Sequence, residues 1–188
     1  MTTPLTNFGM RLAGYGGQGV LFAGRVIANA GLLSGKEVSW LPSYGPEMRG
    51  GTCNCSIFVS DQPIGSPLVV DPDVVIAMNK LSFERFEEFI VPGGLMIADD
   101  STYDFAAESP RDDINHIVYS YAQYASDNGC SDEQGGPLGN LIQVGALWKA
   151  TQFCTEEVLD EALVQSIPER KTALLEVNRK ALELGKAL

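Results

Sequence analysis

Two short stretches of the chain consist only of apolar residues, and they limit the folds that are open to it. They are Val74–Met78 and Leu95–Ala98. A strand with apolar side chains on both faces has to be covered on both faces, as parallel strands in the middle of a sheet are. A helical pattern separates the two runs, and strand and helix patterns alternate elsewhere. The sequence therefore predicts an α/β fold with a mostly parallel sheet.

The other elements follow from apolar periodicity and from chain breakers. Apolar residues recur at helical spacing in Gln18–Leu33, and they alternate with polar residues in the strand Thr52–Ser60. Pro42 is expected to end the strand before it, because proline lacks the amide donor that a strand ladder needs. The other predicted strands are Phe8–Ala13, Glu37–Leu41 and Ile114–Tyr121, and the other predicted helices are Leu81–Ile90, Leu141–Thr151, Thr155–Ser166 and Arg170–Leu188.

Length and charge narrow the range of functions. The chain has 188 residues, which suits one domain over 1–188, and its formal charge is −11. A nucleic-acid-binding protein needs a basic surface that displaces counterions, so nucleic acid is not expected as a partner. No run of about 18 apolar residues is present to span a membrane, and the N-terminal residues lack the pattern of a signal peptide. We therefore expect a cytoplasmic protein that does not bind a membrane.

The spacing of the cysteines and the surroundings of the single histidine argue against metal binding and against nucleophilic catalysis by this chain. Cys53, Cys55, Cys130 and Cys154 form no C-x-x-C pair, so the usual ligands of a zinc site or an iron–sulfur cluster are missing. Without a secretory context they are predicted to be free thiols, with Cys53 and Cys55 on one face of a strand. His116 has no serine motif or neighbouring base beside it, so we predict no catalytic residue and no metal site in this chain.

A glycine-rich turn joins the first predicted strand to the first predicted helix. Its sequence, Gly14-Tyr15-Gly16-Gly17-Gln18-Gly19, has the spacing G-x-G-x-x-G, which lets a backbone approach a phosphate at a helix N-terminus. A dinucleotide-binding fold also needs a carboxylate for the ribose at the end of its second strand, and residues 40–43 contain none. Three interpretations stay open: NAD or FAD binding, another phosphate-bearing ligand or a partner contact, and a turn that serves packing alone.

A second candidate segment is the loop 42–52, which contains two prolines and three glycines. It carries Tyr44, Glu47 and Arg49, whose aromatic, carboxylate and guanidinium groups are common in contact surfaces. Arg49 is suited to hold a phosphate or a carboxylate through two parallel hydrogen bonds. The alternative is a solvated loop with a local pair between Glu47 and Arg49.

Three polar residues adjoin the ends of predicted elements. Asn140 directly precedes the helix 141–151 and is predicted to be its N-cap, with ligand contact as the alternative. Asp99 and Asp100 follow the apolar run 95–98. They are expected either to face a site at the carboxyl end of the sheet or to cap a helix.

The two glycine-rich segments, taken together, resemble a known family. Gly14–Val20 and Ser43–Gly51, in this order, are similar to the gamma subunit of 2-oxoacid:ferredoxin oxidoreductases, and the likeness continues through Val74–Asn79 and Pro92-Gly93-Gly94 to Gly185. The resemblance implies a three-layer α/β/α, Rossmann-like domain, as in the gamma domain of pyruvate:ferredoxin oxidoreductase. It also implies one subunit of an enzyme complex that is not active alone.

The chemistry implied by the resemblance is divided among several chains. Such enzymes oxidatively decarboxylate a 2-oxoacid with thiamine diphosphate, pass electrons through iron–sulfur clusters to ferredoxin, and transfer the acyl group to coenzyme A. The implied partners are an alpha subunit, a beta subunit with thiamine diphosphate, a ferredoxin-like subunit with the clusters, and ferredoxin. The isolated chain is open to self-association. The loop 43–51 most resembles chains that serve 2-oxoglutarate, with pyruvate, branched-chain 2-oxoacids and indolepyruvate as alternatives.

The same resemblance links the gamma component to coenzyme A, although no cofactor is expected to be bound firmly by this chain. The residues expected to contact this ligand or a partner subunit are Gly16, Gly17, Gln18, Gly19, Arg25, Tyr44, Glu47, Arg49 and Asn140. Two alternatives come from other classes of protein. One is a scaffold subunit whose glycines only shape an interface, and the other is a small nucleotide-binding dehydrogenase.

Overall fold

A six-stranded sheet forms the middle layer of the protein, seen in a computed structural model that describes residues 5–44, 51–108 and 110–188. The strands are β1 (Phe8–Tyr15), β2 (Glu37–Tyr44), β3 (Thr52–Ser60), β4 (Val74–Ala77), β5 (Leu95–Asp99) and β6 (Asn115–Tyr119). Their order across the sheet is β2-β3-β1-β4-β5-β6. Only β3 runs against its neighbours, and β1, β4, β5 and β6 are parallel. The mixed, mostly parallel sheet confirms the predicted fold class.

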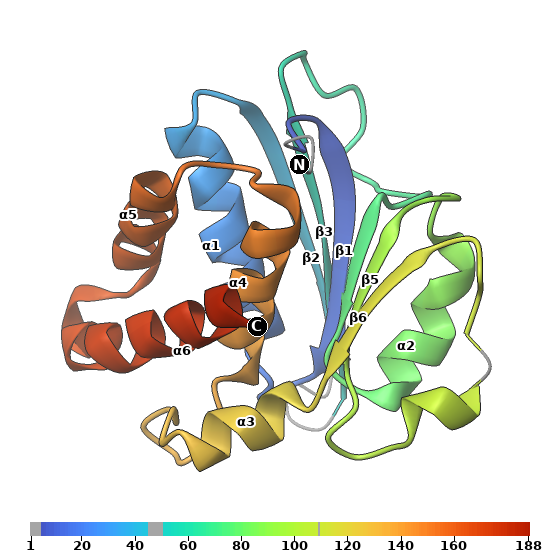
Figure 1. Ribbon diagram of the computed structural model, residues 1–188. Helices are drawn as coiled ribbons and strands as arrows, with labels where there is room; N and C mark the ends of the chain where they lie inside the picture. Colours follow the sequence, from blue (N-terminus) through green and yellow to red (C-terminus); the bar gives the residue numbers. More distant parts are fainter. Residues whose placement is uncertain (1–4, 45–50, 109) are drawn as a thin grey trace.

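Helices cover both faces of this sheet (Figure 1). One face is covered by α1 (Val20–Leu33), α4 (Gly139–Thr151), α5 (Glu156–Ser166) and α6 (Leu175–Ala187), and the other by α2 (Lys80–Phe86). The remaining helices are short: α3 (Tyr121–Asp127) and the 3₁₀ turns η1 (Glu87–Phe89), η2 (Phe105–Glu108) and η3 (Glu169–Leu174). Among the described residues, no helix combines the length and the apolar character needed to cross a membrane.

The predicted apolar runs form the interior strands β4 and β5 and supply both halves of the core. In β4, Val74 and Ile76 pack in the cluster beneath α1 and α4, whereas Val75 and Ala77 pack in the cluster beneath α2. All four side chains are at most 1% exposed. Burying a valine or isoleucine side chain completely stabilises a fold by about 1.5–3 kcal/mol. The run therefore holds both helical layers to the sheet, as its composition predicts.

Several predicted strand ends differ from the structure by one to three residues, and two of these differences have a clear physical cause. Pro42 does not end β2, because the strand continues to residue 44 and Pro42 lies opposite Cys55. β2 is the edge strand of the sheet and pairs only with β3, so a residue without an amide donor is tolerated there. The strand predicted over 114–121 ends at Tyr119, and α3 begins at Tyr121. The carboxylate of Asp99, which is distant in sequence, caps the start of α3 by accepting a hydrogen bond from the Ala122 amide at 2.9 Å.

The C-terminal helix is also shorter than predicted. Residues 169–174 form η3 instead of the first turns of a helix, and Lys171 has the non-helical angles φ −117° and ψ 17°. The Thr172 hydroxyl donates to the Glu169 carbonyl at 2.6 Å, a local bond that competes with the helical pattern. The regular helix α6 then begins at Leu175.

Helices α4 and α6 approach each other closely through a pair of glycines. A Cβ atom added to Gly145 would lie 2.9 Å from the Cα of Gly185, and the reverse distance is also 2.9 Å. Each added Cβ would also clash with a backbone carbonyl of the other helix, that of Leu182 or of Ile142. Backbone atoms cannot move aside as the end of a flexible side chain can. The two helices therefore need glycine at both positions.

We predict that Gly145→Ala and Gly185→Ala each lower the free energy of unfolding by about 3 kcal/mol, because overpacking a rigid contact costs about 1–3 kcal/mol and here the contact is with backbone. Gly65→Ala is the matched control, since a Cβ at Gly65 meets no atom within 4 Å. Urea unfolding followed by circular dichroism measures the three variants. Equal stability of Gly185→Ala and Gly65→Ala would contradict the close approach.

Candidate functional site

The connections after β1 and β4 place a crevice at the carboxyl end of the sheet. These two strands are parallel neighbours, but the chain leaves β1 for α1 on one face and leaves β4 for α2 on the other face (Figure 1). Ligands of open α/β sheets bind where neighbouring connections diverge in this way. The glycine-rich turn, residues 14–19, lies at this point of the fold.

Gln18 holds the turn against the neighbouring strand. Its Oε1 accepts hydrogen bonds from the amide of Tyr15 at 2.7 Å and from Nδ2 of Asn79 at 2.8 Å. Its Nε2 donates to the carbonyl of Met78 at 2.7 Å. The side chain predicted to contact a ligand is thus engaged with protein atoms on both sides, and its main effect is to fix the shape of the turn.

Gly19 and Asn140 join the beginnings of α1 and α4. Gly19 is the N-cap of α1 with φ 76°, and its carbonyl accepts a hydrogen bond from Nδ2 of Asn140 at 3.2 Å. A Cβ on Gly19 would lie 2.9 Å from Cγ of Asn140, so glycine is required by both conformation and space. The prediction that Asn140 caps α4 is wrong. Leu138 is the N-cap, and the buried Asn140 amide reaches across to Gly19 instead.

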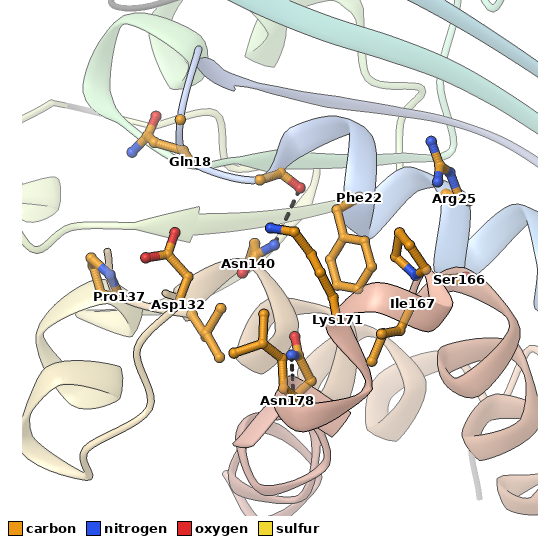
Figure 2. A pocket seen from close by; sticks show the side chains of 15 residues that line it. Gln18, Phe22, Arg25, Asp132, Pro137, Asn140, Ser166, Ile167, Lys171 and Asn178 are labelled. Carbon is orange, nitrogen blue, oxygen red and sulfur yellow. Dashed lines mark hydrogen bonds between the residues drawn. The ribbon is translucent and has the colours of Figure 1, made fainter. Parts of the chain in front are cut away.

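A cavity of about 330 Å³ opens beside this contact. Figure 2 shows that its side chains come from three directions: from α1, from the loop before α4, and from the segments that follow α5. Phe22, Leu138 and Ile167 contribute apolar surface. Of the predicted residues, Gly17, Gln18, Gly19, Arg25 and Asn140 line it. Gly16 does not; its amide donates to the Gly51 carbonyl at 2.9 Å, and it lines a neighbouring cavity with residues 51–53.

The cavity carries two cationic side chains with different surroundings. Arg25 is exposed on α1, and its guanidinium lies 5.8 Å from the centre of the Trp40 ring. Lys171 lies in η3, with Nζ 2.8 Å from Oε2 of Glu133. Both partners of that ion pair are at least 40% exposed, and exposed pairs contribute little energy, so an anion can compete with Glu133 for the lysine. Arg25 and Lys171 are therefore able to face an anionic ligand.

Phe22, Lys171 and Asn178 were not among the predicted site residues. Phe22 follows Gly19 by three residues, which places it one helical turn beyond the glycine motif. That spacing is the one sequence signal that could have identified Phe22 as a site residue. Lys171 and Asn178 reach the cavity because η3 turns before α6 begins. The sequence predicts an uninterrupted helix there, so it gives no indication of this turn.

Asp99 caps a helix, which is one of its two predicted roles, and its side chain also borders a small cavity. Its carboxylate accepts hydrogen bonds from the amides of Ser101 at 2.8 Å and Ala122 at 2.9 Å, and the second bond caps α3. It also lines a small cavity of about 70 Å³ between the glycine turn and α4. Burial raises the pKa of the Asp99 carboxyl, and these hydrogen bonds oppose the rise.

The remaining reactive side chains lie outside the cavity. His116 is half-buried in β6, with Nε2 3.2 Å from Oε1 of Glu87. The four cysteines are free thiols, as predicted, and burial raises the pKa of Cys55 and of Cys154 to about 12. Within the segments that the structure describes, no group of three or more His, Cys, Asp and Glu side chains is placed to hold a metal ion. Glu47, Arg49 and the side chain of Tyr44 lie outside the described residues.

Comparison with known sequences decides the family. The profile of the pyruvate ferredoxin/flavodoxin oxidoreductase family matches residues 9–188. The chain belongs to this family. The match confirms the resemblance that the two glycine-rich segments indicated.

Relatives within the oxidoreductase family differ in length. The chain is 32% identical over 176 residues to the ketoisovalerate oxidoreductase subunit VorA of Methanothermobacter marburgensis, covering 94% of this chain and 35% of VorA. It is 30% identical over 161 residues to the 2-oxoglutarate synthase subunit KorC of Methanocaldococcus jannaschii, covering 85% of this chain and 83% of KorC. The chain thus spans most of one relative and about a third of the other.

A solved structure confirms the family fold. The 2-oxoglutarate:ferredoxin oxidoreductase of Magnetococcus marinus, determined with 2-oxoglutarate, coenzyme A and succinyl-CoA bound, superimposes with a TM-score of 0.81. The match covers 97% of this chain and 31% of that one, at 23% identity. The three-layer architecture predicted from the resemblance is therefore correct.

We predict that Gly19→Ala costs more stability than Gly17→Ala. Both residues have positive φ, 76° and 104°, so both substitutions place an alanine in a disfavoured conformation, but only Gly19 would also clash with Asn140. We expect a difference of about 1–3 kcal/mol in the free energy of unfolding. Asn140→Gly in the same chain should recover part of the difference, which a double-mutant cycle measures. Equal losses at both glycines would show that the contact does not constrain the turn.

We predict that Cys55 reacts slowly with iodoacetamide in the folded protein. A pKa of about 12 lowers the thiolate fraction at pH 8 roughly a thousandfold from that of an ordinary thiol, and the thiolate is the nucleophile. The rate should rise with pH up to the pKa or until the protein unfolds. Peptide mass spectrometry of native and urea-unfolded samples measures it, and rapid modification in the native sample would contradict the prediction.

Proposed function

We propose that this chain is the gamma component of a multisubunit 2-oxoacid:ferredoxin oxidoreductase and that its cavity binds part of coenzyme A. The cavity beside the glycine turn carries the proposal, because it joins an accessible backbone turn, an apolar wall and two cations in one place. These features match a ligand with phosphates at one part and apolar groups at another.

The residues present fit coenzyme A. A Cβ on Gly17 would meet no atom within 4 Å, so the turn is open on that side to a phosphate that approaches the backbone. Arg25 and Lys171 supply positive charge for the phosphates, and Phe22 with Ile167 supplies a surface for the apolar portion. Coenzyme A supplies the thiol that accepts the acyl group. This chain's contribution is to bind and orient the ligand.

The substrate that we favour for the whole complex is 2-oxoglutarate. Two observations support it: KorC is matched over most of its length as a separate chain, and the loop 43–51 resembles chains that serve this substrate. Ketoisovalerate is the main alternative because of the match to VorA, and pyruvate and indolepyruvate are others. We assign thiamine diphosphate to a beta subunit, the clusters to a ferredoxin-like subunit, and the rest of the oxoacid pocket to an alpha subunit, with ferredoxin as the electron acceptor.

We predict that Lys171→Gln and Arg25→Gln each raise the Kd for coenzyme A about tenfold, since a hydrogen bond to a charged group contributes about 1.5–3 kcal/mol. Lys180→Gln is the control, because Lys180 is exposed on α6 and does not line the cavity. Calorimetric titration of the chain measures the Kd, and the KM for coenzyme A is measured on the assembled complex. No binding by the wild-type chain, with an unchanged KM in the variants, would favour a scaffold. Binding of NAD or FAD without coenzyme A would favour a dehydrogenase.

We predict that the chain, tagged and purified from its native cells, brings down a thiamine diphosphate subunit and a cluster-bearing subunit. The purified complex should reduce ferredoxin with the highest kcat/KM on 2-oxoglutarate. Higher kcat/KM on ketoisovalerate or pyruvate would reassign the substrate. Oxidation of a substrate by this chain alone would contradict the proposed division among subunits.

A further inference from the structure

The face covered by α2 carries a surface that the proposed coenzyme A site does not use. We define the α2 patch as Leu68, Val70, Leu81, Arg85 and Phe89, together with the adjoining Arg11. Its four apolar side chains are 41–59% exposed, and they make up four of the ten large exposed apolar residues in the described part of the chain. Clustered apolar surface of this kind marks contact sites more often than scattered single residues do.

Contacts around the Phe86 ring bring Arg11, Arg85 and the segment 68–70 together. The guanidinium groups of Arg11 and Arg85 lie 5.0 Å and 5.5 Å from the centre of the Phe86 ring. Nη2 of Arg11 donates to the carbonyl of Val69, which places the guanidinium beside the backbone of residues 68–70. Leu81 and Arg85 are four residues apart on α2, so they share one face of the helix.

The two arginines of the α2 patch lack negative partners. No ion pair of either guanidinium with a carboxylate is found among the described residues, and Nε of Arg11 is buried without an acceptor. Burial, and then the charge of Arg85, lowers the pKa of Arg11. This arrangement occurs in a chain whose net charge is −11, so carboxylates are plentiful elsewhere on it. A carboxylate brought by another molecule would form charge-assisted hydrogen bonds with the exposed Arg85 and lie close to the charge of Arg11.

We propose that the α2 patch docks a segment of another subunit of the complex, in which a carboxylate pairs with Arg11 and Arg85 and apolar side chains cover Leu68, Val70 and Phe89. This inference rests on the proposed function, since the partner is a subunit of that complex. A second copy of the chain is a poorer occupant. A two-fold interface uses the same patch on both copies, and the α2 patch contains no carboxylate that a second copy could offer to the arginines.

The test is co-expression of this chain with the other subunits, followed by association measurements on the purified parts. Arg85→Glu should raise the Kd for the partner about tenfold or more, because a like charge replaces the attraction. Arg85→Lys should retain most of the affinity, and wild-type binding should weaken as salt is raised. Lys180→Glu, an exposed charge reversal on α6, is the matched control and should change the Kd less than twofold; circular dichroism verifies the folding of each variant.

Three results would overturn the proposal. If the Arg85→Glu variant binds every other subunit as tightly as the wild-type chain does, the α2 patch is not part of an interface. The proposed function would be unaffected by that result. Loss of self-association, and of nothing else, in Arg85→Glu would assign the patch to a second copy of the chain. Failure of the wild-type chain to bind any subunit of the complex would overturn both this inference and the proposed function.

Discussion

The hydrogen bond from Asn140 to the carbonyl of Gly19 joins two helix ends that are 121 residues apart in the sequence. Gln18 ties the same turn to the end of β4 through Met78 and Asn79. The turn is therefore held from two sides by elements that are themselves anchored in the core. These contacts fix the shape of the turn within the folded chain, so a ligand that bound there would meet a preformed backbone and would not have to order it.

The layers and the sheet were predictable because they follow from patterns that repeat over many residues. The apolar run at β4 admits only a strand buried on both faces, and the alternation in Thr52–Ser60 reproduces β3 to the residue. Such patterns indicate which side chains are buried, and the side chains that are buried depend on where each element lies in the three layers. Resemblance to the family then added the three-layer architecture and the importance of both glycine-rich segments.

The failures have a different physical origin, since each depends on a contact with a distant part of the chain. Asn140 is a residue type that commonly caps helices, but in the fold its side-chain amide donates to the carbonyl of Gly19 instead of capping α4. Pro42 would end a central strand, and it is accepted because β2 is at the edge. Lys171 comes to the cavity through a local break in a pattern that reads as one helix. Site residues are therefore harder to predict than elements, because one contact decides where each side chain lies.

The sheet separates the two surfaces to which we assign contacts. The cavity lies among α1, the loop before α4 and η3, on one face, whereas the α2 patch lies beside Phe86 on the face covered by α2. A subunit docked on α2 would therefore leave the cavity accessible to a small ligand. The central strands contribute side chains to both clusters, so they hold the two surfaces in a constant relative position. In the function that we propose, this domain would in this way present coenzyme A at a defined distance from the neighbouring subunit that performs the chemistry.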